Sequence, residues 1–280
     1  MAEPFGIASS AISIAAAFTA CVDCFGYIQF GRHFGRDFQT DLLALNCARL
    51  RLTRWGQAVN IYGDPNLGRP DAKPGEIQTV KDTLFQILVL FSNTEKISRK
   101  YKLNAKAGND LSILGPDDGD PTVVTINNKM RELSLRRQKG TSILKTARWA
   151  LYDRAEFKEL IKDITSLIDN VETLFPPPRS QVEVIVTEET NQLDKESLKI
   201  VESAAQDVDN LLQAAVKEAL IGHQYVRVVV KGKAHTGDSF SADWQGNVVG
   251  ASHKYVDVVV EKDGEALMGN KYGGKDFWDE

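Results

Sequence analysis

The chain has 280 residues, of which 42% are hydrophobic and 26% are charged, and its 38 acidic and 34 basic side chains give a net charge of −4. This composition is typical of a globular protein with one large domain or two small ones, and the acidic balance gives no reason to expect nucleic acid as a partner. Three cysteines are too few for a disulfide scaffold, so we expect a reducing, cytoplasmic setting.

In the first thirty residues, no charged side chain occurs from Phe5 to Val22, Asp23 then interrupts, and residues 24–30 are again uncharged. A stretch of this length can cross the hydrocarbon of a bilayer. Its isoleucine, phenylalanine and valine side chains contribute about −2 to −4 kcal/mol to insertion and Asp23 costs up to about 3.5 kcal/mol, so insertion is close to neutral. Two interpretations stay open: a membrane-active segment, or a buried central helix of the domain.

Before Gly222, apolar residues recur at spacings of three, four and seven, which is typical of amphipathic helices. The clearest runs are residues 38–62, 77–91, 157–174 and 193–220, and we expect them to pack as an all-α helical bundle. Val182–Val186 alternates apolar and polar residues and leaves room for a short two-stranded β element. The last helix of the bundle is expected at about Glu189–Leu220.

The composition changes at about Gly222. All 9 prolines precede this point, whereas residues 222–280 contain 10 valines, 9 of the 21 glycines and a single leucine, Leu267. These residue types favour strands and turns rather than helices. The sequence therefore predicts two domains, a helical domain at 1–221 and a second domain, here called the tail, at 222–280.

The tail contains an internal repeat. Val226–Lys231 matches Val256–Glu261 at a spacing of 30 residues. The pair Gly246-Asn247 matches Gly269-Asn270 at a spacing of 23. Stacked parallel layers would place matched residues over each other, with Gly-Asn supplying the positive φ of the turns.

Opposite charges occupy matched positions of the longer repeat, Arg227 against Asp257 and Lys231 against Glu261. In stacked layers these pairs would lie over each other and select the register. An ordinary hairpin or small β-domain is the alternative. Fewer than 60 residues with few bulky apolar side chains cannot bury much core, so we expect the tail to be disordered in the monomer and to order by pairing with other copies.

Catalytic and metal-binding signals are weak. Cys21 and Cys24 form a CxxC pair, but in an apolar helix two packed thiols are the better interpretation. The histidines lack metal-ligand spacing, and Gly269–Lys275 resembles a phosphate-binding loop without its Ser or Thr. We therefore predict no enzyme activity, no metal and no cofactor. One basic run is either a solvated helix face or a contact with anionic lipid headgroups, and comprises Lys129, Arg131, Arg136, Arg137, Lys139, Lys145 and Arg148.

Several motifs stand out from the helical pattern, namely Glu3-Pro4-Phe5-Gly6, Cys21-Val-Asp-Cys-Phe25, Gly31-Arg-His-Phe-Gly-Arg-Asp37, Arg54-Trp55-Gly56, Arg136-Arg-Gln-Lys139, Trp149-Ala-Leu-Tyr-Asp153 and Gly269-Asn-Lys-Tyr-Gly-Gly-Lys-Asp-Phe-Trp-Asp-Glu280. Together they resemble the HeLo domain and the prion-forming tail of the fungal HET-s/HET-S heterokaryon-incompatibility family. The resemblance covers nearly the whole chain in the family's order.

The resemblance implies a HeLo-like bundle followed by a tail that forms a β-solenoid in the amyloid state. In toxic members of the family, a template on a nucleotide-binding receptor or on another copy orders the tail. The helical domain then releases its N-terminal segment into the plasma membrane and kills the cell, whereas harmless members propagate as prions. In this chain the membrane segment is residues 5–30, with the insertion residues Phe5, Ile7, Ile12, Ile14, Phe18, Val22, Phe25 and Ile28.

The resemblance also implies further site residues. Asp23 and His33 form the switch region, and His33 favours the toxic class. Tyr272, Phe277 and Trp278 belong to an aromatic loop that closes the solenoid. The full amyloid core would comprise Val228, Val230, Trp244, Gly246, Asn247, Val258, Val260, Leu267, Gly269, Asn270, Tyr272, Phe277 and Trp278.

Two departures from the family pattern concern the tail. Its first repeat, residues 235–247, matches loosely, with Trp244 at a rung position, and the linker between the repeats is shorter than in the family. We predict a cytoplasmic cell-death effector that relocates to the plasma membrane. Its partners would be other copies, a prion-motif-bearing nucleotide-binding receptor and membrane lipid. The alternative is a non-toxic prion-forming scaffold whose helical domain stays folded.

Overall fold

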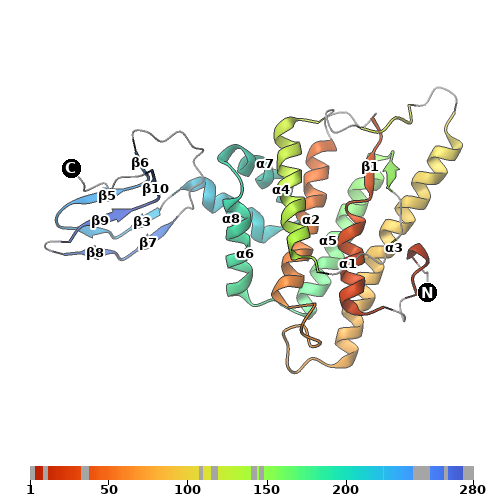
Figure 1. Cartoon of the computed structure of the whole chain (residues 1–280), viewed down its shortest axis with the longest axis horizontal. Coiled ribbons are helices and arrows are strands. Elements are labelled where there is room, and N and C mark those ends of the chain that lie inside the picture. The colour runs from red at the N-terminus through yellow and green to blue at the C-terminus, as the bar shows by residue number, and fades with distance from the viewer. Residues whose placement is uncertain are drawn as a thin grey trace.

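The computed structural model describes residues 4–8, 12–32, 38–106, 110–114, 119–139, 144, 148–222, 224–241, 253–261 and 264–273 (Figure 1). Helices occupy most of the chain before Gly222, and short strands occupy the described residues after it. The bundle comprises the 3₁₀ turn η1 (Pro4–Gly6), α1 (Ile14–Cys24), β1 (Ile28–Phe30), α2 (Phe38–Ala58), α3 (Pro74–Asn104), α4 (Pro121–Arg137), β2 (Trp149–Leu151), α5 (Arg154–Leu174), α6 (Arg179–Asn191), α7 (Lys195–Ala205) and α8 (Asn210–Ile221).

Local sequence signals explain where several of these helices begin. Asp120, Asp153, Asp194 and Asp209 each accept a hydrogen bond from a backbone N–H of the first turn and thereby cap α4, α5, α7 and α8. Proline occupies the first position of α3 and of α4, where its missing N–H costs no hydrogen bond. The bundle is thus divided into helices largely by short-range chemistry.

Helix α2 is the centre of the bundle. It contacts α4, α5, α6 and α7, and α3 packs against both α5 and α1. In Figure 1, α6, α7 and α8 lie on the side of the bundle that faces the tail, and α1 and α3 lie on the other side. The segment predicted to reach the membrane and the tail are therefore separated by α2. Fully buried side chains of the core include Leu43, Leu50, Trp55, Leu84, Ile87, Phe91 and Phe157.

Two predictions about the second half of the bundle are wrong. Val182–Val186 lies inside α6, where Val182, Ile185 and Val186 are buried and Val184 is 60% exposed. This spacing of three and four is helical, and it overrides the alternation read from the sequence. The helix predicted at about Glu189–Leu220 is also divided, because α6 ends at Asn191 and a turn at Gln206–Asp209 separates α7 from α8.

A short two-stranded β element is present, but at another place. Strands β1 and β2 pair in parallel, with Ile28 opposite Trp149 and Phe30 opposite Leu151. This pair fixes the end of the first thirty residues to the chain just before α5. The first thirty residues are therefore not one helix, because a 3₁₀ turn, α1 and β1 follow one another within them.

The tail forms two layers of short strands. The first layer contains β3 (Gln224–Val226), β4 (Val229–Val230), β5 (Ala234–Thr236) and β6 (Ser239–Phe240), and the second contains β7 (Lys254–Val256), β8 (Val259–Val260), β9 (Ala266–Met268) and β10 (Lys271–Tyr272). Each strand of the first layer pairs in parallel with the corresponding strand of the second. This is the two-layer arrangement of a β-solenoid. Absence of structure in the isolated monomer stays a prediction.

The register of the layers confirms one predicted match and corrects the other. Val229 lies opposite Val259, at the predicted spacing of 30 residues. In the second half of each layer the spacing is 32, with Ala234 opposite Ala266 and Lys271 opposite Ser239. Gly269-Asn270 therefore follows the strand that lies over Ala234–Thr236, and its predicted match with Gly246-Asn247 is wrong. Residues 242–250, with Trp244, Gly246 and Asn247, lie outside the described residues.

Candidate functional site

Helix α1 is the most deeply buried part of the first thirty residues. All its side chains from Ala17 to Val22 are buried. The ring of Phe18 lies 6.4 Å from that of Trp55 and 5.8 Å from that of Tyr62. Gly56 leaves the space for this ring, since a Cβ at that position would overlap it. Burial of one such side chain contributes about 1.5–3 kcal/mol, so Phe18 is a main anchor of α1 on α2.

Polar groups of α1 are hydrogen-bonded inside the bundle. The bonds join Thr19 Oγ1 to Tyr62 Oη at 2.9 Å, Cys21 Sγ to the Leu84 carbonyl at 3.0 Å, and Gln138 Nε2 to Asp23 Oδ1 at 2.6 Å. The second carboxylate oxygen, Asp23 Oδ2, is buried and has no hydrogen-bond partner among the described residues. The one charged residue of segment 5–30 is therefore incompletely satisfied where it lies, which weakens the attachment of α1.

The predicted insertion residues fall into two groups. Phe18, Val22 and Phe25 are buried, and Phe25 packs edge-on against Phe91 with 5.1 Å between ring centroids. The others are half-buried and pack against the same core at its edge, namely Phe5, Ile7, Ile12, Ile14 and Ile28. Among the described residues, no helix is both long enough and apolar enough to cross a membrane. His33 lies outside the described residues.

All three cysteines are buried and free. Burial raises the pKa of the Cys21 and Cys24 thiols well above the ordinary value, and the carboxylate of Asp23 adds to this effect. Burial likewise raises the pKa of Cys47. These thiols are therefore protonated and poorly nucleophilic in the folded bundle. Within the described part of the chain, no group of His, Cys, Asp and Glu side chains could hold a metal ion.

A buried ion-pair cluster joins four helices on the other side of α2. Arg54 Nη2 lies 2.9 Å from Glu189 Oε2 and 2.6 Å from Asp209 Oδ2, and Arg137 Nη1 lies 2.5 Å from Glu189 Oε1. The side chains of Arg54, Glu189 and Asp209 are at most 3% exposed. Burial by itself would lower the pKa of Arg54, but Asp209 and Glu189 outweigh it and raise that pKa. The cluster therefore holds α2, α4, α6 and the start of α8 together as charged, mutually dependent groups.

Asp209 links this cluster directly to the helix that leads into the tail. Its Oδ1 accepts from Arg54 Nη1 at 3.1 Å and from the Leu212 backbone N–H at 3.1 Å, so one carboxylate pairs with α2 and caps α8. Arg51, one turn before Arg54, donates to the carbonyl of Val208 at 2.9 Å and pairs with Glu172 on α5. Any displacement of α8 therefore changes contacts of α2.

Three successive residues of α2 thus make contacts on two opposite sides of this helix. Arg54 contacts α6 and α8, whereas Trp55 and Gly56 hold Phe18 of α1. Trp55 Nε1 also donates to the Phe175 carbonyl at 3.0 Å, which fixes the indole. The motif Arg54-Trp55-Gly56 therefore lies between α1, which belongs to the segment predicted to insert into the membrane, and α8, the helix that leads into the tail. This placement could not be obtained from helical periodicity, because the two faces are set by the packing of helices distant in sequence.

The tail turns at matched corners in its two layers. Arg227 and Asp257 both have positive φ, 56° and 54°. Gly237 and Gly269 form a second matched corner, with φ of 97° and 121°, a backbone conformation that suits glycine. A Cβ at Gly269 would overlap the carbonyl of Gly237 beneath it. The second corner therefore requires glycine in the second layer for close stacking on the first.

Side chains also connect the layers. Asn270 donates from its backbone N–H to Asp238 Oδ1 at 2.8 Å and from its side-chain amide to the same oxygen at 3.0 Å. Arg227 and Asp257 form the predicted pair, with 3.8 Å between Nη1 and Oδ1. The second predicted pair, Lys231 with Glu261, is absent between these two described residues, and Lys233 pairs with Glu265 at 3.5 Å instead. Lys233 and Glu265 are 32 positions apart, which is the spacing of the second half of the layers.

The structure places the predicted amyloid-core residues unevenly. Val228, Val230, Val258, Val260, Leu267, Asn270 and Tyr272 are half-buried, and Phe277 and Trp278 lie outside the described residues. Their role in an amyloid core stays a prediction. Ala266 and Met268, which lie in the predicted rung Ala266–Asn270, are buried although they are not among the named core residues, and the sequence reasoning missed Asp238, which bonds Asn270. Alignment of Gly237-Asp238 with Gly269-Asn270 in the sequence would have identified Asp238.

Comparison with known proteins shows the family of this chain. A family model described as "HeLo: Prion-inhibition and propagation" matches residues 6–211. The heterokaryon incompatibility proteins s and S of Podospora anserina are each 33% identical to this chain over 289 aligned positions, covering 100% of both sequences. The chain belongs to the HET-s/HET-S family of heterokaryon incompatibility proteins. This agrees with the motifs from Glu3 to Glu280.

Solved structures of the HET-s/HET-S family confirm the helical fold. The HET-s N-terminal domain is similar with a TM-score of 0.69 and 33% identity, and covers 76% of this chain and 100% of that domain. A mutant of the same domain gives a TM-score of 0.67 and 34% identity, with 73% and 96% covered. The prion character of the HET-s/HET-S family implies self-assembly of this chain, and the family is not one of known enzymes.

Proposed function

We propose that this chain is a heterokaryon-incompatibility cell-death effector, in which templating of the tail by another amyloid makes the bundle release segment 5–30 into the plasma membrane. The observation that carries the proposal is the double attachment of Arg54-Trp55-Gly56. Arg54 pairs with Asp209 at the start of α8, and the two residues beside it hold Phe18 of α1. Membership of the HET-s/HET-S family supplies the biological setting.

Release requires the segment to refold. Helix α1 has 11 residues, which correspond to about 16 Å, whereas the hydrocarbon core is about 30 Å thick. Residues 5–30 as one continuous helix would reach about 39 Å. The 3₁₀ turn and β1 must therefore give up their present conformations, and pairing of β1 with β2 must break. Local opening of one helix and one short strand costs less than global unfolding.

The coupling step acts through α8. Ordered tail layers stacked on a template occupy the space next to Gly222, which directly follows α8. Displacement of α8 would separate Asp209 from Arg54 and leave buried charges unpaired, which costs about 3–5 kcal/mol. The unpaired charges would destabilise the packing of α2 at the point where Trp55 and Gly56 contact Phe18. A two-state bundle biased in this way links a tail event to α1 without direct contact.

A second function, that of a non-toxic prion-forming scaffold, is favoured by a specific observation. All side chains of Ala17–Val22 are buried, and α1 makes hydrogen bonds to Tyr62, Leu84 and Gln138. A helix held this firmly could remain in the core while the tails polymerise. The two functions differ in one measurable property, namely vesicle leakage upon seeding.

The deciding experiment mixes the full-length chain with preformed fibres of residues 222–280 and anionic vesicles that contain a fluorescent dye. The effector predicts dye release that depends on seeds. Ile14→Lys should abolish leakage while leaving seeded fibre growth unchanged, because a charge at the helix centre costs about 2.5–3.5 kcal/mol on insertion. Ile200→Lys is the matched control, since Ile200 is also half-buried but lies on α7 outside the segment.

Seeded fibres without leakage by the unmodified chain would support the scaffold and contradict the effector. Loss of both activities in Ile14→Lys would contradict the separation of tail and bundle. Equal loss of leakage in Ile200→Lys would show that general destabilisation, and not the segment, is responsible.

The cysteines provide an independent measurement of release. Because burial raises their thiol pKa, all three should resist alkylation at pH 8 in the resting chain. After seeding without vesicles, Cys21 and Cys24 should become reactive as α1 leaves the bundle and their pKa returns toward the ordinary value. Cys47 lies on α2 and should stay protected, so it serves as an internal control for global unfolding. Unchanged protection of Cys21 and Cys24 would contradict release.

A further inference from the structure

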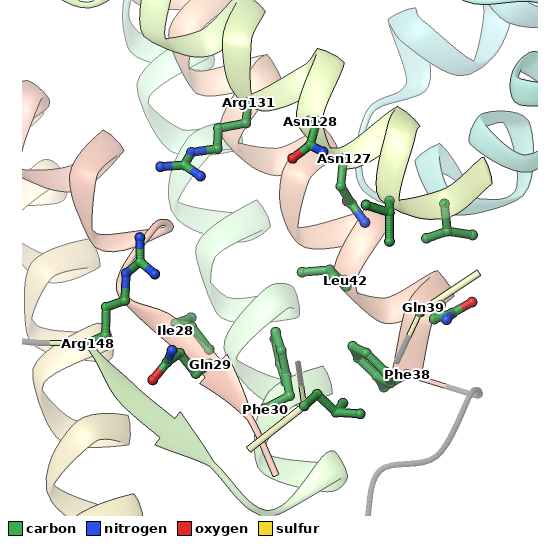
Figure 2. Close-up of a pocket in the computed structure, with 14 residues that line it drawn as sticks. Ile28, Gln29, Phe30, Phe38, Gln39, Leu42, Asn127, Asn128, Arg131 and Arg148 are labelled. Carbon is green, nitrogen blue, oxygen red and sulfur yellow. The ribbon is translucent and has the colours of Figure 1, made fainter. Parts of the chain in front are cut away.

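The bundle contains a second potential site, which the proposed mechanism does not use. A cavity of about 400 Å³ lies between β1, the first half of α2 and α4. Figure 2 shows Ile28, Phe30, Phe38 and Leu42 around it, with the guanidinium groups of Arg131 and Arg148 at one end. A neighbouring lobe of about 210 Å³ continues this end toward Arg49. The two lobes share the walls formed by Ile28, Leu42, Asn127 and the two exposed arginines.

All the charged residues that line this cavity are positive. Arg49, Arg131 and Arg148 line it, and none of the described residues in its walls is acidic. The carboxylate of Asp23 attracts the charge of Arg49, but the two residues form no ion pair in the described structure. Three cations in one small region repel each other and are stabilised when an anion binds between them.

Arg49 is the residue that distinguishes this cavity from an ordinary basic surface. It is only 3% exposed, and its Nε atom has no hydrogen-bond partner among the described residues. Burial, and then repulsion from Arg131, lower its pKa to about 10, so it still carries its charge at neutral pH. A buried, charged and unpartnered donor is costly unless a ligand or an ion satisfies it.

The other end of the cavity provides a different chemistry. Its wall is mainly apolar, with Phe30, Phe38, Leu114 and Val123. A single buried donor, Gln39 Nε2, faces this region without a hydrogen-bond partner, and Gln39 is 8% exposed. The volume is within the range of small-molecule sites, which combine apolar walls with a few placed polar groups.

We propose that this cavity binds a phosphate-bearing amphiphile, whose phosphate lies among Arg49, Arg131 and Arg148 and whose apolar part lies between β1 and α2. Arginine suits this role because its planar guanidinium pairs with two phosphate oxygens at once. Asn128 and Gln29 add amide donors at the same end of the cavity. The ligand therefore bridges β1, which ends segment 5–30, to α2 and α4.

The position of β1 in the wall has a consequence that rests on the proposed function. A ligand that binds only the folded bundle stabilises it by mass action. Because Ile28 and Phe30 leave this wall when segment 5–30 is released, a bound ligand opposes release. The cavity would thus set the threshold at which a templated tail activates the bundle.

The test measures binding to the resting full-length chain by isothermal titration calorimetry, without seeds or vesicles, so that its result does not depend on membrane release. The probes are dihexanoyl phosphatidic acid, inorganic phosphate and, as a zwitterionic control, dihexanoyl phosphatidylcholine. We expect phosphatidic acid to bind and phosphatidylcholine to bind at least about tenfold more weakly. Tight binding of inorganic phosphate, equal to that of phosphatidic acid, would assign the site to the phosphate group alone and overturn the role of the apolar wall.

Two arginines of α4 form a matched pair of variants. Arg131→Gln should weaken binding of phosphatidic acid about tenfold, because it removes a charged donor from the cavity. Arg136→Gln makes the same change of charge on the same helix at an exposed position outside the cavity, and should change affinity less than about twofold. Arg148→Gln, also exposed, repeats the test from the opposite wall. Unchanged binding in both cavity variants, or an equal loss in Arg136→Gln, would overturn the proposal.

Discussion

In the bundle, Phe18, Trp55 and Phe91 are at most 1% exposed, whereas in the tail Val229, Val256 and Val259 are 48%, 53% and 61% exposed. The bundle is stabilised by apolar side chains that contact residues far away in sequence. The tail is stabilised by parallel backbone hydrogen bonds between two layers, such as the bond from the Val229 N–H to the Val258 carbonyl at 3.0 Å. The bundle thus has a core formed within one chain, whereas the tail has edge strands whose backbone groups can pair with another copy.

This difference explains how one chain can both fold and polymerise. In the bundle, most apolar side chains of the helices are buried in one core within the single chain. Each tail layer pairs with a copy of its own pattern, so the same bonds can form between chains. Substitutions in each part of the chain can break this contrast, and the largest effect is expected in the bundle.

The buried ion-pair cluster should be the most sensitive part of the bundle. Arg54→Met leaves Asp209 unpaired and Glu189 with Arg137 alone, and should lower the free energy of unfolding by about 3–5 kcal/mol. Urea denaturation of the full-length chain, followed by far-UV circular dichroism, measures this change. Arg179→Met is the control, because the Arg179–Glu183 pair is exposed and should contribute less than about 0.5 kcal/mol. Equal effects of the two substitutions would contradict a structural role of the cluster.

The contact between α1 and α2 should be broken by one methyl group. Gly56→Ala would place a Cβ into the ring of Phe18 and should destabilise the bundle by about 1–3 kcal/mol. The same substitution at Gly75, in the first turn of α3, meets no atom within 4 Å and should stabilise by about 0.5–1 kcal/mol through helix propensity. Thermal or urea unfolding of the two variants therefore moves in opposite directions. Stabilisation by Gly56→Ala would mean that α1 does not pack on α2 in this way.

Stacking of the tail between copies should depend on a glycine that is uncrowded in the single chain. A Cβ at Gly269 overlaps the Gly237 carbonyl, whereas a Cβ at Gly237 meets nothing within 4 Å. If copies continue the same stack, Gly237 of one chain lies over Gly269 of the next. Gly237→Ala and Gly269→Ala should then each slow seeded elongation about tenfold, with the bundle unchanged. Growth of Gly237→Ala at the unmodified rate would show that copies join in another register.

The smallest effect is expected from the ion pair across the first corner. Arg227 and Asp257 are 82% and 63% exposed in their side chains, so solvent screens their attraction. Asp257→Asn should change fibre stability by less than about 1 kcal/mol, and this difference should vanish in about 1 M salt. Glu261→Gln, which removes a charge without a described ion pair, is the control. A larger, salt-independent loss would mean that the pair is buried in the assembled form.

Much of the candidate site could be predicted from residue patterns, but its connections could not. The uncharged run from Phe5 to Val22 marked the segment, and the 30-residue repeat marked the stacked layers. Nothing local indicated that Arg54 would pair with Asp209, 155 positions later. The arginine cavity was equally hidden, because Arg49 lies in an apolar helix pattern and meets Arg131 only when α2 and α4 pack.

The wrong sequence predictions have the same cause, namely contacts between residues that are far apart in the chain. Val182–Val186 alternates like a strand, yet it is helical because Val182, Ile185 and Val186 share the face that meets the bundle. Residue type alone matches Gly246-Asn247 with Gly269-Asn270, whereas the layers place Gly237-Asp238 there because parallel strands align by their backbones and their corners.

By itself, the sequence determined the helical character of the chain before Gly222 and the layered character after it. These follow from apolar periodicity and from the preferences of valine, glycine and proline, which act over a few residues. Only the tertiary structure decided which face of α2 packs against α1 and which carboxylates pair with Arg54. It also decided how many residues separate the positions that pair between the two tail layers. Those features depend on contacts between residues far apart in the chain, where packing and buried charge outweigh local preference.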